Sequence, residues 1–165
     1  MNYIKEQLAL TLLGLIKTKE FHDISISELV NKAGVGRASF YRKYTCKEDV
    51  LSQYIVEKLE QWKKDFDANT SGDFVVSLFN YFYENKELYL LLYKANLSNL
   101  LYEGIRIASG INSPPDNIST YTVATFAGTL FGLIDEWMRR GMIETPEELH
   151  YMLNIKWYKR QYFLL

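Results

Sequence analysis

The sequence of 165 residues contains one cysteine, Cys46, and two histidines, His22 and His150. A single cysteine excludes an internal disulfide framework and fits a reducing compartment, so we expect a cytoplasmic protein. The histidines belong to no metal-ligand spacing, and the chain has no glycine-rich phosphate loop and no G-x-S-x-G motif. The sequence therefore predicts a protein that is not an enzyme and uses no metal or cofactor. Cys46 is expected to be a small buried or half-buried residue rather than a catalytic thiol.

Strand patterns and membrane spans are also missing. The sequence shows no strand-type alternation, no internal repeat and no low-complexity tract, and its start lacks the layout of a signal peptide. Residues 117–134 carry no charge, but they include four threonines, one asparagine and two glycines. A buried helix is favoured there over a membrane span, which needs a more apolar stretch. With 48% hydrophobic residues, the chain is expected to be a folded soluble protein.

What the sequence does contain is the stretch SISELVNKAGVGRASFYRKY, which predicts two short helices that meet at a glycine. Ser25 and Glu28 have the spacing of a capping box, so the first helix can begin there. Gly34 reaches left-handed backbone angles without steric cost and is expected to end that helix. Phe40 and Tyr44, four residues apart, give the second helix an inward face. The pattern is typical of a helix-turn-helix, whose second helix enters the DNA major groove.

Positive charge is concentrated around this stretch, although the formal net charge of the chain is only −1. The charged residues from 32 to 47 are Lys32, Arg37, Arg42, Lys43 and Lys47, with no acidic residue among them. Cations gathered in this way favour contact with nucleic-acid phosphates. The alternative is a solvated basic helix that has no partner.

Several segments resemble a known family. AGVGRASFYRKYTCKEDVL, residues 33–51, resembles the end of the helix-turn-helix and the opening of the next helix in the TetR family of bacterial transcriptional regulators. Residues 4–15 resemble the first helix of that family. Residues 126–138 and 141–149 are similar to the C-terminal domain of a Firmicutes-type branch, which includes regulators linked to dihydroxyacetone kinase operons. The resemblance implies a homodimer that binds double-stranded DNA at a near-palindromic operator.

The resemblance also implies which residues contact DNA. Ser25, Tyr41 and Lys47 are assigned to phosphates, and Lys43 can join them. The bidentate fork of Arg37 suits guanine O6 and N7, Ala38 can meet a thymine methyl group, and Ser39 can contact either a base or a phosphate. The full set expected at the DNA is Ser25, Gly36, Arg37, Ala38, Ser39, Tyr41, Arg42, Lys43 and Lys47.

The fold class expected is all-α, with about nine helices. Residues 1–46 are assigned to a three-helix helix-turn-helix DNA-binding domain and residues 47–165 to a helical regulatory and dimerisation domain. A second capping box, from Thr45 to Glu48, is expected to start a long helix. The remaining helices are expected at 2–18, 74–83, 86–95, 97–108, 118–140 and 146–158, with a loop at 109–117 and a basic, aromatic tail at 157–165 that has no assigned role.

The predicted helix 118–140 has small residues one turn apart, at Ala124, Gly128 and Gly132, with Phe131 and Trp137 beside them. Because most of its circumference is apolar, this helix must be covered on most sides. We predict that a partner subunit covers it, as the resemblance also implies. The alternative is a core helix covered within one chain.

Aromatic residues fill the middle of the sequence and make a candidate ligand pocket. Its members are Trp62, Phe66, Phe82, Tyr89, Tyr93 and Tyr102. Ligand sites are mostly apolar with a few placed polar groups, which tyrosine hydroxyls can supply. An ordinary aromatic core is the favoured alternative, so a small-molecule effector remains open. A second functional hypothesis is a co-regulator that does not bind DNA and docks on another regulator.

Overall fold

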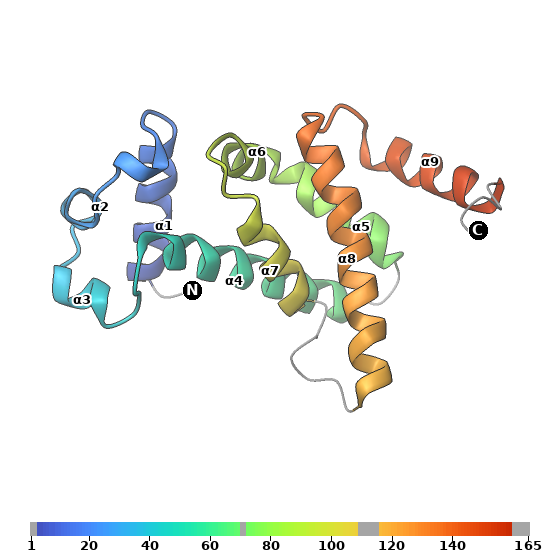
Figure 1. Cartoon of the computed structure of the whole chain (residues 1–165), viewed down its shortest axis with the longest axis horizontal. Helices are drawn as coiled ribbons and strands as arrows, with labels where there is room; N and C mark the ends of the chain where they lie inside the picture. Colours follow the sequence, from blue (N-terminus) through green and yellow to red (C-terminus); the bar gives the residue numbers. More distant parts are fainter. Residues whose placement is uncertain (1–2, 70–71, 109–115, 160–165) are drawn as a thin grey trace.

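The computed structural model describes residues 3–69, 72–108 and 116–159, and every regular element within them is helical (Figure 1). The prediction of an all-α fold is confirmed. The elements are α1 (Tyr3–Ile16), the 3₁₀ turn η1 (Phe21–Asp23), α2 (Ile26–Ala33), α3 (Arg37–Tyr41), α4 (Lys47–Ala68), α5 (Phe74–Glu84), α6 (Lys86–Lys94), α7 (Asn99–Ala108), α8 (Asn117–Arg139) and α9 (Pro146–Lys159). The expected loop and tail fall largely on residues 109–115 and 160–165, outside the described ranges.

The first three helices form a unit at one end of the molecule (Figure 1). Along α1, Leu8, Leu12 and Leu15 recur in the sequence at helical spacing, and all three are buried. This stripe packs against both α2 and α4. Phe21 and Ile24 are also buried, so the connection between α1 and α2 folds onto the same core.

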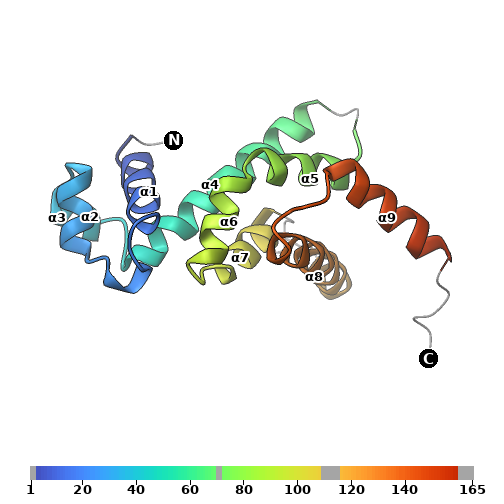
Figure 2. The ribbon, with the colours of Figure 1, turned by 90° about the horizontal axis from the view of Figure 1, so that it is seen from above.

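The long helix α4 leads from this unit into the rest of the protein (Figure 2). Its predicted start is wrong in detail, because Cys46 is the N-cap and makes no side-chain capping bond. The side chain that reaches back to Thr45 is that of Asp49, not that of Glu48. The Asp49 carboxylate accepts a hydrogen bond from the Thr45 hydroxyl and a second one, of 2.8 Å, from the Thr45 backbone N–H. With the helix starting at Lys47, Asp49 occupies the third helical position, from which a side chain can reach the residues before the helix. The bond from the Thr45 hydroxyl contributes most to lowering the pKa of the Asp49 carboxyl, and the bond from the Thr45 backbone N–H adds to it.

Of the helices that follow α4, α7 makes the most extensive contact with it and α5 packs against it as well, whereas α8 packs on α6 and α7, and α9 packs on α5. Gly104 is buried at the crossing of α7 and α4. A Cβ atom at this position would lie 2.9 Å from side-chain atoms of both Ile55 and Leu59. The crossing therefore depends on a residue without a side chain.

The turn between α8 and α9 folds back onto the core. Trp137 is 2% exposed and packs edge-on against Phe79, with ring centroids 5.7 Å apart. Its indole N–H donates to the Glu144 carbonyl at 3.0 Å. Tyr83 lies parallel to the same indole, with centroids 6.0 Å apart. The first half of α8 extends past α7, as the lower end of the orange helix in Figure 1 shows.

No helix within the described residues is long and apolar enough to span a membrane. The expectation that 117–134 is a buried helix is wrong for the first half of α8 within this chain, where Ile118 and Tyr121 are 80% and 75% exposed.

Candidate nucleic-acid interface

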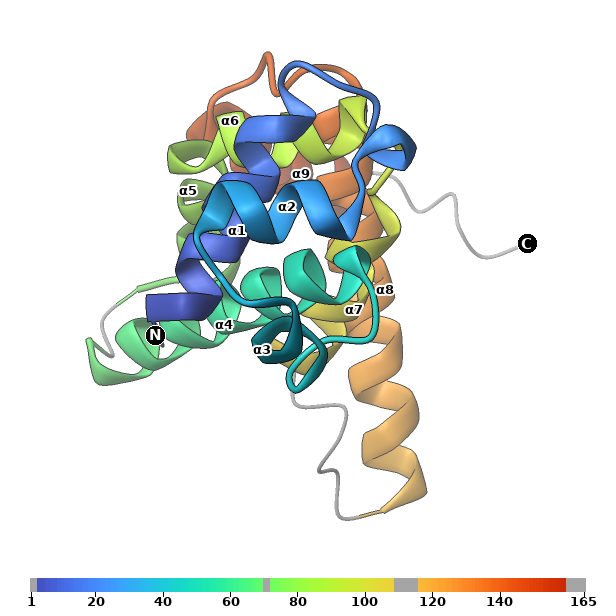
Figure 3. The same cartoon turned by 90° about the vertical axis from the view of Figure 1, so that its left-hand side faces the viewer.

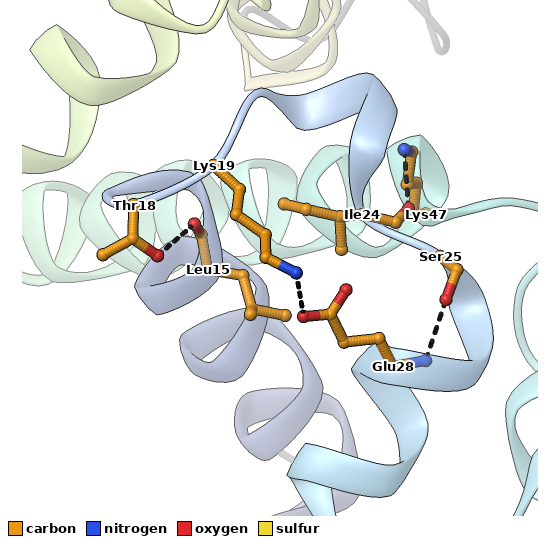
Figure 4. Close-up of polar contacts among 7 residues, drawn as sticks. All are labelled: Leu15, Thr18, Lys19, Ile24, Ser25, Glu28 and Lys47. Atoms are coloured by element: carbon orange, nitrogen blue, oxygen red, sulfur yellow. Dashed lines mark hydrogen bonds and ion pairs between the residues drawn. The ribbon is translucent and has the colours of Figure 1, made fainter.

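The first helix of the predicted motif begins as its sequence indicates. Ser25 is the N-cap of α2, and its hydroxyl oxygen accepts from the Glu28 backbone N–H at 3.1 Å (Figure 4). The Glu28 carboxylate binds the Lys19 ammonium at 2.6 Å. Two polar contacts, one within α2 and its cap and one from Lys19 in the segment after α1, therefore fix the start of α2.

The corner between α2 and α3 depends on a glycine. Gly34 is the C-cap of α2 with φ +65°, a left-handed angle that a residue with a side chain rarely adopts. The backbone N–H of Val35 closes the turn on the Val30 carbonyl at 2.9 Å. Val35 packs against the core as a partly buried residue. The predicted corner is confirmed in this respect.

Helix α3 has one face buried against the core and one face exposed. Phe40 is fully buried and Tyr44, just past the helix, is 3% exposed, as predicted. Arg37 and Ala38 are exposed, and Tyr41 is 48% exposed. In Figure 3, where this end of the molecule faces the viewer, α3 lies on the surface in front of α4.

Side chains on the outward face are arranged by contacts with one another. The Arg37 guanidinium lies 5.7 Å from the centroid of the Tyr41 ring, close enough for a cation–π contact. The Arg42 guanidinium donates to the Ser39 hydroxyl at 2.8 Å. These contacts hold two cations beside the outward face of α3.

The predicted DNA-contact residues gather at one end of the molecule. Ser25, Gly36, Arg37, Ala38, Tyr41 and Arg42 are exposed, and Ser39, Lys43 and Lys47 are partly buried. Among the residues that the structure describes, no ion pair joins Arg37, Arg42 or Lys43 to a carboxylate. Their charges are therefore available to an anionic partner.

Lys47 is engaged differently from the other cations. Its ammonium donates to the backbone carbonyls of Ile24 at 2.8 Å, His22 at 3.2 Å and Phe21. The sequence pattern did not indicate these acceptors, because backbone carbonyls carry no side-chain signature. Lys47 was expected to bind a DNA phosphate, but in the structure its ammonium binds backbone carbonyls of the protein instead.

The six aromatic residues of the predicted pocket do not share one space. Trp62 stacks on Phe66 with centroids 5.9 Å apart, whereas Phe82 and Tyr89 are fully buried and 4.7 Å apart. The Tyr89 hydroxyl bonds to that of Tyr81 at 2.9 Å, and burial raises the pKa of Tyr89 well above its usual value.

The other two members belong to separate contacts with α8. The Tyr93 hydroxyl donates to Asp135 at 2.6 Å, and the Tyr102 ring lies 5.0 Å from that of Phe131. The six residues therefore act mainly as packing and polar contacts between helices, which is the alternative favoured by the sequence.

Two open cavities lie near these helices. One of about 330 Å³ is bordered by Trp62, Ser77 and Tyr81. The other, of about 480 Å³, lies between α1 and the turn from α5 to α6, and Leu10 and Gly14 line it. The sequence pattern did not indicate the larger cavity, although Leu10 lies off the buried stripe of α1 and is 49% exposed.

The predicted dimer face is open for most of its residues. Gly128 and Gly132 are exposed, and a Cβ atom on either would meet nothing within 4 Å. Ala124 and Phe131 are partly buried. Trp137 requires a correction, because its packing against Phe79 places it in the core of the chain rather than beside an exposed face.

Comparisons with known proteins agree on the type of fold. Residues 69–155 match the family TetR_C_8, described as a transcriptional regulator C-terminal region. The crystal structure of Lin0861 from Listeria innocua is similar with a TM-score of 0.76 and 18% identity, covering 96% of this chain and 91% of that one. At this identity the likeness concerns the fold alone. No curated protein matches the sequence significantly.

Proposed function

This chain belongs to the TetR-type transcriptional regulators, because more than half of its length matches their C-terminal region, and we propose that it binds operator DNA as a homodimer. The observation that carries the proposal is the exposed face of α3. Phe40 and Tyr44 anchor this helix in the core, so that Arg37 and Ala38 point away from the protein. We assign residues 1–46 to DNA binding and residues 47–165 to regulation and dimerisation.

In the proposed complex, α3 enters the major groove and Arg37 reads a guanine through its two parallel donors. Ala38 is placed for contact with a thymine methyl group. Tyr41 and Ser25 are exposed on either side of the motif and are assigned to phosphates. Gly36 precedes α3 as its N-cap, and the absence of a side chain there leaves room for the DNA backbone. Ser39, Arg42 and Lys43 complete the proposed contact surface.

The proposed dimer forms through α8. Its exposed half carries large apolar side chains, with Ile118 80%, Tyr121 75% and Phe126 43% exposed. Exposed apolar patches of this kind on a helix mark an interaction surface. Gly128 and Gly132 leave a flat path along the same helix, and a second copy of α8 can approach there closely.

We further propose that the chain is cytoplasmic and belongs to the Firmicutes-type branch linked to dihydroxyacetone kinase operons. The segments that carry this resemblance, residues 126–138 and 141–149, lie inside the region that matches the family.

Control by a small molecule is a separate proposal, and the cavity between α1 and α6 is a better candidate site than the six aromatic residues. That cavity touches the proposed DNA-binding domain through Leu10 and Gly14.

The proposed function is tested by selecting duplexes from a random pool with the purified protein. We expect a near-palindromic site whose half-sites are separated by about one helical turn, or a multiple of it. Analytical ultracentrifugation of the complex should show protomers bound in pairs. Failure to enrich any duplex, or enrichment of a site without symmetry by a monomer, would refute the proposal.

A further inference from the structure

The inference concerns the Lys47 side chain at the start of α4. Its ammonium donates to the carbonyl oxygens of Phe21, His22 and Ile24, and it lies 4.4 Å from the centroid of the Phe21 ring. An ammonium has three N–H donors, so these three carbonyls account for all of them. In this arrangement no donor is left for a DNA phosphate.

The acceptors come from the end of η1, where carbonyl groups collect. Ile24 is the C-cap of this turn, and its backbone N–H bonds to the Phe21 carbonyl at 3.2 Å. The Phe21 carbonyl therefore accepts from both Ile24 and Lys47 through its two lone pairs, and carbonyls at the end of a helical turn carry partial negative charge. A lysine ammonium satisfies them and gains a cation–π contact with Phe21.

Lys47 links two elements that also both pack on α1. Helix α1 packs on α2 and on α4, whereas Lys47 links the first residue of α4 directly to the segment before α2. Ile24, one of its acceptors, immediately precedes Ser25, the N-cap of α2 (Figure 4). A rotation of α4 relative to the helix-turn-helix would break these bonds.

We propose that Lys47 is a positioning residue, which holds α2 and α3 at a fixed angle on α4, and is not a phosphate contact. The inference rests on the proposed DNA-binding function. In a dimer, two copies of α3 must meet half-sites at a fixed separation. An error in the angle between α3 and α4 therefore weakens binding at both half-sites.

The test compares Lys47→Met and Lys47→Arg with the control Lys43→Met. Binding to the duplex selected by the wild-type protein is measured by fluorescence anisotropy over a series of salt concentrations. Loss of a phosphate contact lowers the slope of log K against log salt by about one, and we expect this for Lys43→Met. For Lys47→Met we expect the salt slope to be unchanged and the affinity to fall by roughly tenfold. A tenfold loss is what the removal of a hydrogen bond from a charged donor typically causes.

Lys47→Arg separates the two roles without removing the charge. A guanidinium suits a phosphate well, but its planar donors cannot converge on three carbonyls as an ammonium does. The positioning role therefore predicts weakened binding by Lys47→Arg, at the wild-type salt slope. Normal binding by Lys47→Arg together with a lowered slope for Lys47→Met would identify a phosphate contact and overturn the proposal. Unchanged affinity in both variants would overturn it too.

Hydrogen exchange without DNA gives a readout that does not depend on the proposed function. The backbone N–H groups of Asp23 and Ile24 close the η1 turn by donating to the Glu20 and Phe21 carbonyls, at 3.1 and 3.2 Å. We expect them to exchange faster in Lys47→Met than in the wild type, and at the wild-type rate in Lys43→Met. Faster exchange combined with no DNA binding by the wild type would refute the proposed function, and the positioning role with it, while leaving the Lys47 contact in place.

Discussion

Gly104 on α7 lies so close to Ile55 on α4 that a Cβ atom on the glycine would be 2.9 Å from the Ile55 Cγ2 atom. Real Cβ atoms do not approach other carbons this closely, because non-bonded carbons repel each other well inside their optimal separation of about 3.5–4.0 Å. The separation of α4 and α7 is therefore determined by the glycine.

Gly104→Ala is expected to lower the free energy of unfolding by about 1–3 kcal/mol, because α7 or the side chains of Ile55 and Leu59 must shift. The matched control is Gly14→Ala, since a Cβ atom at Gly14 in α1 would meet nothing within 4 Å. That change should raise the free energy of unfolding by about 0.4–1 kcal/mol, through reduced freedom of the unfolded chain. Urea denaturation measures both. Equal stability of the two variants would contradict the close crossing.

Asp135 is expected to make stability depend on pH in acidic solution. It accepts from Arg139 at 2.7 Å and from Tyr93 at 2.6 Å. Partial burial opposes ionisation, but these bonds outweigh it and lower the pKa of the carboxyl below its usual value. The stabilising effect is therefore fully present above that value, and it is lost as the pH falls through the lower folded-state pKa.

Asp135→Asn should accordingly be less stable than the wild type near neutral pH, and the difference should shrink below about pH 4. Thermal unfolding over a pH series measures this. Glu136→Gln, an exposed neighbour on the same helix, serves as the control and should change little. A stability difference that stays constant down to pH 2 would show that the Asp135 charge is not the cause.

Gly128→Leu is expected to convert the proposed dimer into monomers. The site is exposed and open within the chain, so the substitution leaves the fold of one protomer undisturbed. A leucine there would hold two α8 helices apart. Light scattering coupled to gel filtration measures the mass, and Gly14→Leu is the control for a helical glycine elsewhere on the surface. A Gly128→Leu protein that is still dimeric and binds its operator normally would place the interface elsewhere.

Features set by neighbours in the sequence were predictable. The Ser25 cap, the Gly34 corner and the buried stripe of α1 depend on residues within a few positions, and the structure contains each of them. The error at Thr45 was also local, because Asp49 and Glu48 both offer a carboxylate and only the start of α4 decides between them.

Contacts between distant segments were not predictable in the same way. Trp137 was expected beside a partner, but its burial depends on Phe79 and Tyr83 from α5, more than fifty positions earlier. The acceptors of Lys47 are backbone carbonyls some twenty-five positions away, and every residue type has such a carbonyl, so the sequence cannot identify them. The aromatic residues of the middle helices likewise read as one group, whereas helix packing separates them.

The most direct test of DNA recognition by α3 is operator selection carried out in parallel with the wild-type protein, Arg37→Ala and the control Lys43→Ala. We expect the wild type to select guanine at one position in each half-site. Arg37→Ala should lose that preference at both symmetric positions and weaken binding to the wild-type site by about 1–3 kcal/mol. Lys43→Ala should keep every base preference and bind all duplexes more weakly. An Arg37→Ala protein that selects the wild-type site with unchanged preference would contradict the assignment of α3 as the recognition helix.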